Sequence, residues 1–98
     1  MGNQVYCRNE YIIIRIGDEY VVYNKRKEFS NGHSHIKNFK TAKYLIDMAI
    51  SKRIPNHLSC YLLTSLIRIS DDLKYQIKIQ ELIDVKKNKK QKYINRTA

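Results

Sequence analysis

Residues 56–70, with the sequence NHLSCYLLTSLIRIS, constrain the fold more than any other stretch of the chain. Six of their side chains recur at the spacing of one helical face, at i, i+3, i+4, i+7, i+8 and i+11: Leu58, Tyr61, Leu62, Ser65, Leu66 and Ile69. A second apolar strip runs along the far side and consists of Cys60, Leu63 and Ile67. A helix with apolar side chains on two sides needs neighbours on both. The stretch therefore predicts the central helix of the fold.

A third strip of the same helix is polar and is the first candidate for a binding site. Its members follow one edge of the helix at i, i+4, i+7 and i+11: His57, Tyr61, Thr64 and Arg68. Arg68 stands in an otherwise apolar segment, and two interpretations of it are open. In the first, it lays its stem on the core and pairs with an acid such as Asp47 or Asp71. In the second, its guanidinium donates paired hydrogen bonds to a phosphate or carboxylate ligand.

Residues 11–16 and 20–24 predict a β-hairpin. Both segments are rich in β-branched and aromatic side chains, and Gly17 and Asp18 between them form a two-residue turn signal. The turn sets the register and places three pairs opposite one another: Ile14 and Val21, Ile12 and Tyr23, Ile13 and Val22. The first two pairs share one face of the hairpin and the third lies on the other face. Both faces are therefore partly apolar.

A second hairpin is predicted further along the chain. Asn31 and Gly32 can take the positive φ of a type I′ turn, which would pair residues 28–29 with residues 33–36. The two hairpins together would make a three-stranded antiparallel meander. Residues 1–9 are polar apart from two side chains and either add a short strand or stay outside the sheet.

The segment before the central helix predicts another helix, over residues 39–53. Asn38 is suited to the N-cap position, and Ile54-Pro55 ends the helix because the residue before proline avoids helical angles. The helix has an apolar stripe at the expected spacing: Phe39, Ala42, Leu45, Ile46, Ala49 and Ile50.

A third helix is predicted to open at Ser70-Asp71-Asp72, which reads as a cap with acids in the first turn. Residues 73–85 also alternate in part like a strand, but the cap and the long polar continuation favour a helix that fades near Lys87. The sequence thus predicts one α+β domain over residues 1–86. In it, a two- or three-stranded antiparallel meander packs on about three helices, and a basic tail follows over residues 87–98.

The formal net charge of +10 is unevenly distributed along the chain. Residues 86–98 hold six of the 19 basic residues and none of the nine acidic ones. Clustered lysine and arginine attract any polyanion through counterion release, although a solubilising role for the tail is equally open. The candidate nucleic-acid contacts come from a basic bend and from the tail: Lys25, Arg26, Lys27, Lys86, Lys87, Lys89, Lys90 and Lys92.

The triplet His33-Ser34-His35 is the sharpest local motif. If it is extended, its two imidazoles face the same side, about 6–7 Å apart. Such a pair suits a phosphate clamp, a metal pair or a general acid and base. A metal needs a further ligand, for which only His57 and Glu28, expected to face His35, are at hand. We expect no metal and no cofactor, and the candidate ligand-binding set is His33, His35, His57, Tyr61, Thr64 and Arg68.

Several classes of protein are disfavoured by what the sequence lacks. It has no glycine-rich phosphate loop and no GxSxG, HExxH or zinc-finger spacing. Cys7 and Cys60 match no metal spacing. With no signal peptide and no apolar run near 18 residues, we expect a cytoplasmic protein that makes no contact with a membrane.

Three functions fit these features, in the following order. The first is a small non-enzymatic binding protein for an anionic ligand, either nucleic acid or a phosphorylated nucleotide. The second is a protein that binds a protein target, such as an inhibitor or regulator of phage or mobile-element type, for which the small size and the eight tyrosines are suited. The third is a compact phosphodiesterase that uses His33 and His35. We expect a homodimer.

Overall fold

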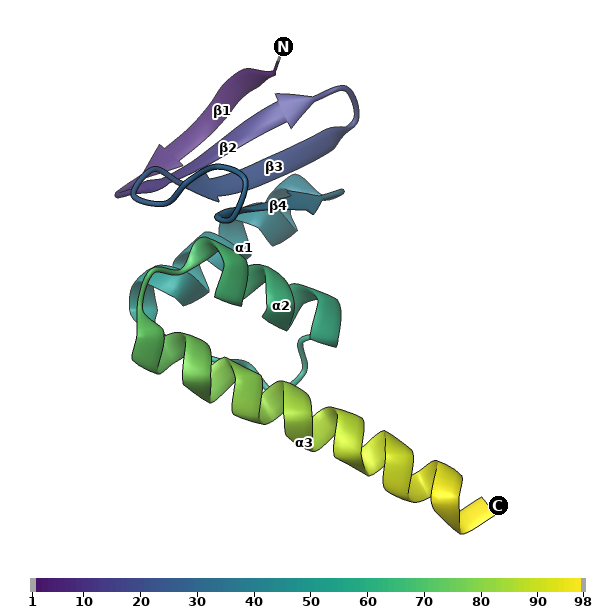
Figure 1. The fold of residues 1–98 in the computed structure, drawn as a ribbon. Coiled ribbons are helices and arrows are strands. Elements are labelled where there is room, and N and C mark those ends of the chain that lie inside the picture. The colour runs from purple at the N-terminus through teal and green to yellow at the C-terminus, as the bar shows by residue number, and fades with distance from the viewer. Residues whose placement is uncertain (1, 98) are drawn as a thin grey trace.

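The computed structural model describes residues 2–97, and the side chains of residues 2–88. Within this part, a four-stranded antiparallel sheet is followed by three helices, so the predicted α+β class is confirmed (Figure 1). The strands pair in chain order and are β1 (Asn3–Arg8), β2 (Tyr11–Ile16), β3 (Glu19–Asn24) and β4 (His33–Ile36). The helices are α1 (Phe39–Ser51), α2 (Cys60–Ile69) and α3 (Leu73–Thr97). The predicted count of two or three strands is wrong.

The hairpin of β2 and β3 forms in the predicted register. Ile14 lies opposite Val21, and Ile13 lies opposite Val22. Gly17 has a φ of 62°, a conformation that glycine adopts at little cost, which explains its place in the turn. The prediction succeeded because turn chemistry acts over a few residues only.

β1 is the strand that the sequence left open. It pairs with β2 through a two-residue turn in which Asn9 takes a φ of 55°. Asparagine is one of the few residues that tolerate this conformation. Tyr6 lies opposite Ile13, and its ring packs edge-on against Phe39 at 6.2 Å between centroids. The other side chains of β1 are exposed, so the strand carries almost no hydrophobic pattern.

The predicted pairing of β4 is wrong. Residues 33–36 form a strand, but it pairs with β3, and residues 25–32 form a loop instead of a partner strand. Neither Asn31 nor Gly32 has a positive φ, so the expected type I′ turn does not form. In the observed pairing with β3, Ser34 and Ile36 lie in the interior.

α2 is the central helix, as predicted. In Figure 1 it lies between the sheet and α3, and it packs against α1, α3, β3 and β4. Leu66 and Ile69 on one predicted strip and Leu63 on the other are fully buried, while Cys60 and Ile67 are half-buried. Burial on two sides is what the two apolar strips require.

The helix ends follow from their capping residues. Asn38 caps α1, because its side chain accepts a hydrogen bond from the Thr41 amide at 3.2 Å. α2 begins later than predicted, at Cys60, because Ser59 is its N-cap and accepts from the Leu62 amide at 3.3 Å. Residues 52–59 therefore connect α1 and α2 without regular structure.

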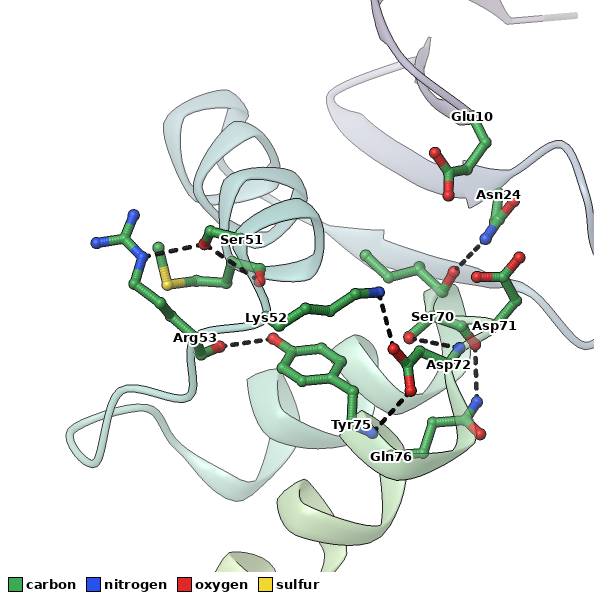
Figure 2. Close-up of polar contacts among 12 residues, drawn as sticks. Glu10, Asn24, Ser51, Lys52, Arg53, Ser70, Asp71, Asp72, Tyr75 and Gln76 are labelled. Atoms are coloured by element: carbon green, nitrogen blue, oxygen red, sulfur yellow. Dashed lines mark hydrogen bonds and ion pairs between the residues drawn. The ribbon is translucent and has the colours of Figure 1, made fainter.

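α3 is anchored at its first turn, shown in Figure 2. Asp72 accepts a hydrogen bond from the Tyr75 amide, and the Tyr75 hydroxyl donates to the Arg53 carbonyl at 2.6 Å. Burial raises the pKa of Tyr75 to about 12, so the hydroxyl stays a donor at physiological pH. The alternative of a strand within residues 73–85 is wrong, and so is an end near Lys87, since α3 continues to Thr97. The side chains of Lys89, Lys90 and Lys92 lie outside the described part.

The loop of residues 25–32 is fixed to the C-terminal end of α2. Asn24, at the end of β3, is completely buried; it donates to the Ile69 carbonyl at 2.9 Å and accepts from the Arg26 amide at 2.8 Å. Lys27 donates to the carbonyls of Arg68 at 2.6 Å and Ser70 at 3.0 Å. These contacts satisfy carbonyls that the end of a helix leaves without internal partners.

Candidate anion-binding site

A hollow of about 200 Å³ between β4 and α2 gathers five of the six candidate ligand-binding residues. We call it the edge hollow because β4 is an edge strand of the sheet. Seven residues line it: His33, Ser34, His35, Tyr61, Thr64, Ser65 and Arg68. The sequence could not show that the HSH segment reaches the polar edge of the central helix, and the structure brings them together.

Two side chains of α2 hold the free edge of β4. The Arg68 Nε donates to the His33 carbonyl at 2.8 Å, and the Tyr61 hydroxyl donates to the His35 carbonyl. Alternate residues of an antiparallel edge strand direct their carbonyls away from the sheet, where they need other partners. The polar strip of α2 supplies these partners and so has a structural role as well.

The Arg68 guanidinium is held in place without an acidic partner. Besides the bond to His33, its Nη2 donates to the Ser30 carbonyl at 3.2 Å. Of the two interpretations of Arg68, the pairing with an acid does not occur within the described side chains: Asp47 pairs with Arg8, and Asp71 lies 3.9 Å from Arg26. A guanidinium has five N–H donors, so those not used for the two carbonyls remain for water or a ligand.

A buried pair of serines forms the inner wall of the edge hollow. The Oγ atoms of Ser34 and Ser65 are 2.6 Å apart, and the Ser65 hydroxyl donates to the Tyr61 carbonyl at 3.1 Å. Their side chains join the middle of β4 to the middle of α2. Helical spacing predicts for Ser65 only a place on an apolar face, and a pairing across 31 residues has no local signal.

The two imidazoles lie on one side of β4, as predicted, with ring centroids 5.2 Å apart. His33 stacks on Phe29 at 4.5 Å, and its Nδ1 lies 2.5 Å from the Phe29 carbonyl oxygen. His35 is exposed, and its Nδ1 lies 3.8 Å from Glu19. The acid near His35 is thus Glu19 on the neighbouring strand, and the predicted Glu28 is wrong because residues 28–29 form no strand.

His57 does not share the edge hollow. Because α2 begins at Cys60, His57 lies in the preceding loop, with its ring 6.3 Å from that of Tyr44. It lines a separate hollow of about 610 Å³, which we call the far hollow: Lys40, Thr41, Tyr44, His57, Leu58, Ser59 and Leu62.

A third hollow, of about 320 Å³, lies between these two, and we call it the middle hollow. It shares His35 and Tyr61 with the edge hollow, and Thr41 and Leu62 with the far hollow. Its full lining is His35, Ile36, Lys37, Asn38, Thr41, Tyr61 and Leu62. Sequence reasoning missed Lys37, Asn38, Lys40 and Thr41 as site residues. Their only signal was a polar helix start directly after the HSH strand.

The basic residues predicted to contact nucleic acid are dispersed. Lys27 is bound to the end of α2, where burial, together with the nearby charge of Arg68, lowers its pKa. Lys86 donates to the Asn56 carbonyl at 2.6 Å, and Arg26 lies 3.6 Å from Glu10. Lys25 and Lys87 are exposed. None of these five lines the three hollows.

The described residues can also be considered for membrane-spanning helices and for clusters of metal ligands. Within residues 2–97, no helix combines the length and the apolar character needed to cross a membrane. In the same part, no three or more His, Cys, Asp or Glu side chains are grouped so that they could hold a metal ion.

No protein-family model matches the sequence, and comparison with curated proteins and with solved structures gives no match.

Proposed function

We propose that the protein is a non-enzymatic binding protein for a phosphate-bearing anion, either nucleic acid or a phosphorylated nucleotide, and that the edge hollow is its site. The observation that carries the proposal is how the Arg68 side chain is bound and what surrounds it. Its guanidinium is fixed by two backbone carbonyls, forms no ion pair with a described acid, and lines a hollow together with Thr64 and with residues His33 and His35 of β4.

The chemistry of this lining suits a phosphate. The planar guanidinium can donate paired hydrogen bonds to phosphate oxygens, and the exposed hydroxyl of Thr64 is a further donor one turn away on α2. The exposed imidazole of His35, on β4 beside the hollow, adds positive charge whenever it is protonated. Because the bonds to β4 already immobilise Arg68, a ligand does not have to order this side chain, which lowers the entropic cost of binding.

Replacing His35 or Thr64 tests the proposal. We expect His35→Ala and Thr64→Val each to weaken the binding of N-methylanthraniloyl-ATP about 10-fold, measured by fluorescence anisotropy in magnesium-free buffer. A hydrogen bond to a charged group is worth roughly 1.5–3 kcal/mol, and about 1.4 kcal/mol corresponds to a factor of ten in affinity. Both side chains are exposed, so neither change should disturb the fold.

Lys78→Ala is the matched control, because Lys78 is an exposed cation of α3 outside the hollows. Its affinity for the labelled nucleotide should stay within about 2-fold of the unchanged protein, since salt screens an exposed charge that does not line the hollow. The proposal fails if His35→Ala and Thr64→Val bind like the unchanged protein, or if Lys78→Ala weakens binding as much as they do.

A further inference from the structure

The edge hollow continues into a row of hollows along the protein surface. His35 and Tyr61 belong to both the edge hollow and the middle hollow, and Thr41 and Leu62 belong to both the middle hollow and the far hollow. The row passes from Arg68 on α2, along β4 and the first turn of α1, to the loop before α2. A row of hollows offers room for a chain of phosphates, which a single hollow does not.

The lining of these three hollows has one sign of charge, whereas a fourth hollow, which shares Tyr44 with the far hollow, is lined by both Asp47 and Arg53. Arg68, Lys37 and Lys40 contribute cations, one to each hollow, and all three histidines of the chain lie along it. Among the described residues, no Asp or Glu lines any of the three hollows. Glu19 approaches His35 from the neighbouring strand and is the nearest acid that the contacts record.

Three of the nine acidic residues gather at another place, away from the lining of the row. Figure 2 shows Glu10, Asp71 and Asp72 near the junction of α2 and α3, beyond the C-terminal end of α2. Lys52 pairs with Asp72 at 3.5 Å, and Arg26 lies close to both Glu10 and Asp71. Lys52 and Arg26 thus have acidic partners at this end, whereas among the described residues no ion pair is recorded for Arg68, Lys37 or Lys40. The field of the protein should therefore favour a polyanion along the row.

Each hollow also has aromatic or imidazole rings in its wall. Tyr61 stands between the edge and middle hollows and is 60% exposed, although its hydroxyl is fixed to β4. Tyr44 and His57 lie beside each other in the far hollow. Rings placed along a cationic groove are how proteins stack the unpaired bases of single strands, independently of sequence.

We propose that the row of hollows is one groove for a single-stranded nucleic acid, with phosphates at Arg68, Lys37 and Lys40 and bases against Tyr61 and the Tyr44–His57 pair. The inference rests on the proposed function and adds the class of ligand: a polynucleotide strand, and not a mononucleotide or a duplex. It predicts that affinity grows with strand length until the groove is filled.

The test uses 5′-fluorescein oligothymidylates of two, four, eight and twelve nucleotides, titrated by fluorescence anisotropy at low salt. We expect the octamer to bind at least about 10-fold more tightly than the dinucleotide, and the dodecamer to add little more, because stacking of each base contributes about 1–3 kcal/mol until the groove ends. A 12-base-pair duplex should bind more weakly than the single-stranded dodecamer.

A double variant separates the groove from the edge hollow. Lys37→Ala/Lys40→Ala removes two exposed cations of the groove. It should weaken octamer binding about 10-fold or more, and reduce the slope of log K against log salt by about 1.4, as expected for two phosphate contacts on a single strand. Lys74→Ala/Lys78→Ala removes the same charge from exposed positions of α3 and should leave octamer affinity within about 3-fold.

Labelled ATP keeps the two proposals distinguishable. If the octamer binds no more tightly than the dinucleotide, if the duplex binds as well as the strand, or if both double variants weaken octamer binding equally, the groove inference is overturned. The proposed function then still stands, provided that labelled ATP remains sensitive to His35→Ala and Thr64→Val. Loss of that sensitivity defeats the proposed function itself.

Discussion

Replacing Leu66 by alanine is expected to lower the free energy of unfolding by about 2–5 kcal/mol, the range measured for removing a leucine side chain from a packed core. Leu66 is fully buried in α2, the helix between the sheet and α3. A cavity at this position weakens the packing at the centre of the molecule. The total free energy of unfolding of a small domain is only about 5–15 kcal/mol, so the loss should be conspicuous in urea unfolding followed by circular dichroism.

Ile67→Ala is the control for this prediction, because Ile67 is the next residue of α2 and is only half-buried. It should lower the free energy of unfolding by no more than about half as much as Leu66→Ala, since the buried apolar area that is lost is smaller. A loss below about 1 kcal/mol for Leu66→Ala, or equal losses for the two variants, would show that α2 is not the centre of the core.

Arg68→Ala is expected to weaken the binding of labelled ATP by about 100-fold or more, the largest effect on binding that we predict. A paired, charge-assisted contact with phosphate is lost, together with the charge that draws the ligand into the edge hollow. Arg68→Lys should recover only a small part of the affinity, because an ammonium lacks the planar fork.

The same change also releases the carbonyls of His33 and Ser30. They lie at the surface, where water replaces the lost donor, so the free energy of unfolding should fall by only about 1 kcal/mol. Arg26→Ala removes an equal charge from a side chain that is 70% exposed and should bind labelled ATP almost normally. Binding by Arg68→Ala at the level of the unchanged protein, or an equal loss in Arg26→Ala, would refute the role given to this guanidinium.

Features that depend on neighbouring residues were predicted well. The β2–β3 register follows from the two-residue turn, and the cap at Asn38 follows from its side chain. The burial of α2 on two sides follows from its two apolar strips. The length of α3 was underestimated although residues 73–97 contain neither glycine nor proline, the residues that most often end a helix. A polar composition carries little hydrophobic periodicity, so the pattern does not indicate where α3 ends.

Contacts between distant segments could not be predicted. Strand β4 pairs with β3 across the loop of residues 25–32, and no local pattern indicates this partner. The bond from Asn24 to the Ile69 carbonyl spans 45 residues, and that from Arg68 to the His33 carbonyl spans 35. Such pairings depend on the assembled core, not on the sequence around either partner.

The candidate site could be predicted only in part, because its residues come from segments that are distant in the sequence. Helical spacing placed Tyr61, Thr64 and Arg68 on one edge, and strand spacing placed His33 and His35 on one side. His57 was misplaced because the cap at Ser59 starts α2 after it. The protein-inhibitor and phosphodiesterase interpretations, the homodimer, the cytoplasmic location and the boundary between domain and tail near residue 86 stay predictions.

Chemical-shift mapping decides where a phosphate binds. Unlabelled ATP is titrated into the uniformly ¹⁵N-labelled protein, and the amide signals are followed in two-dimensional spectra. We predict progressive, saturable shifts at residues 33–35 and 61–68, with little change in β1. Shifts confined to Lys25, Arg26 and the lysines from Lys86 onward, with the signals of β4 and α2 unmoved, would mean that the basic bend and tail bind the anion and that the edge hollow does not.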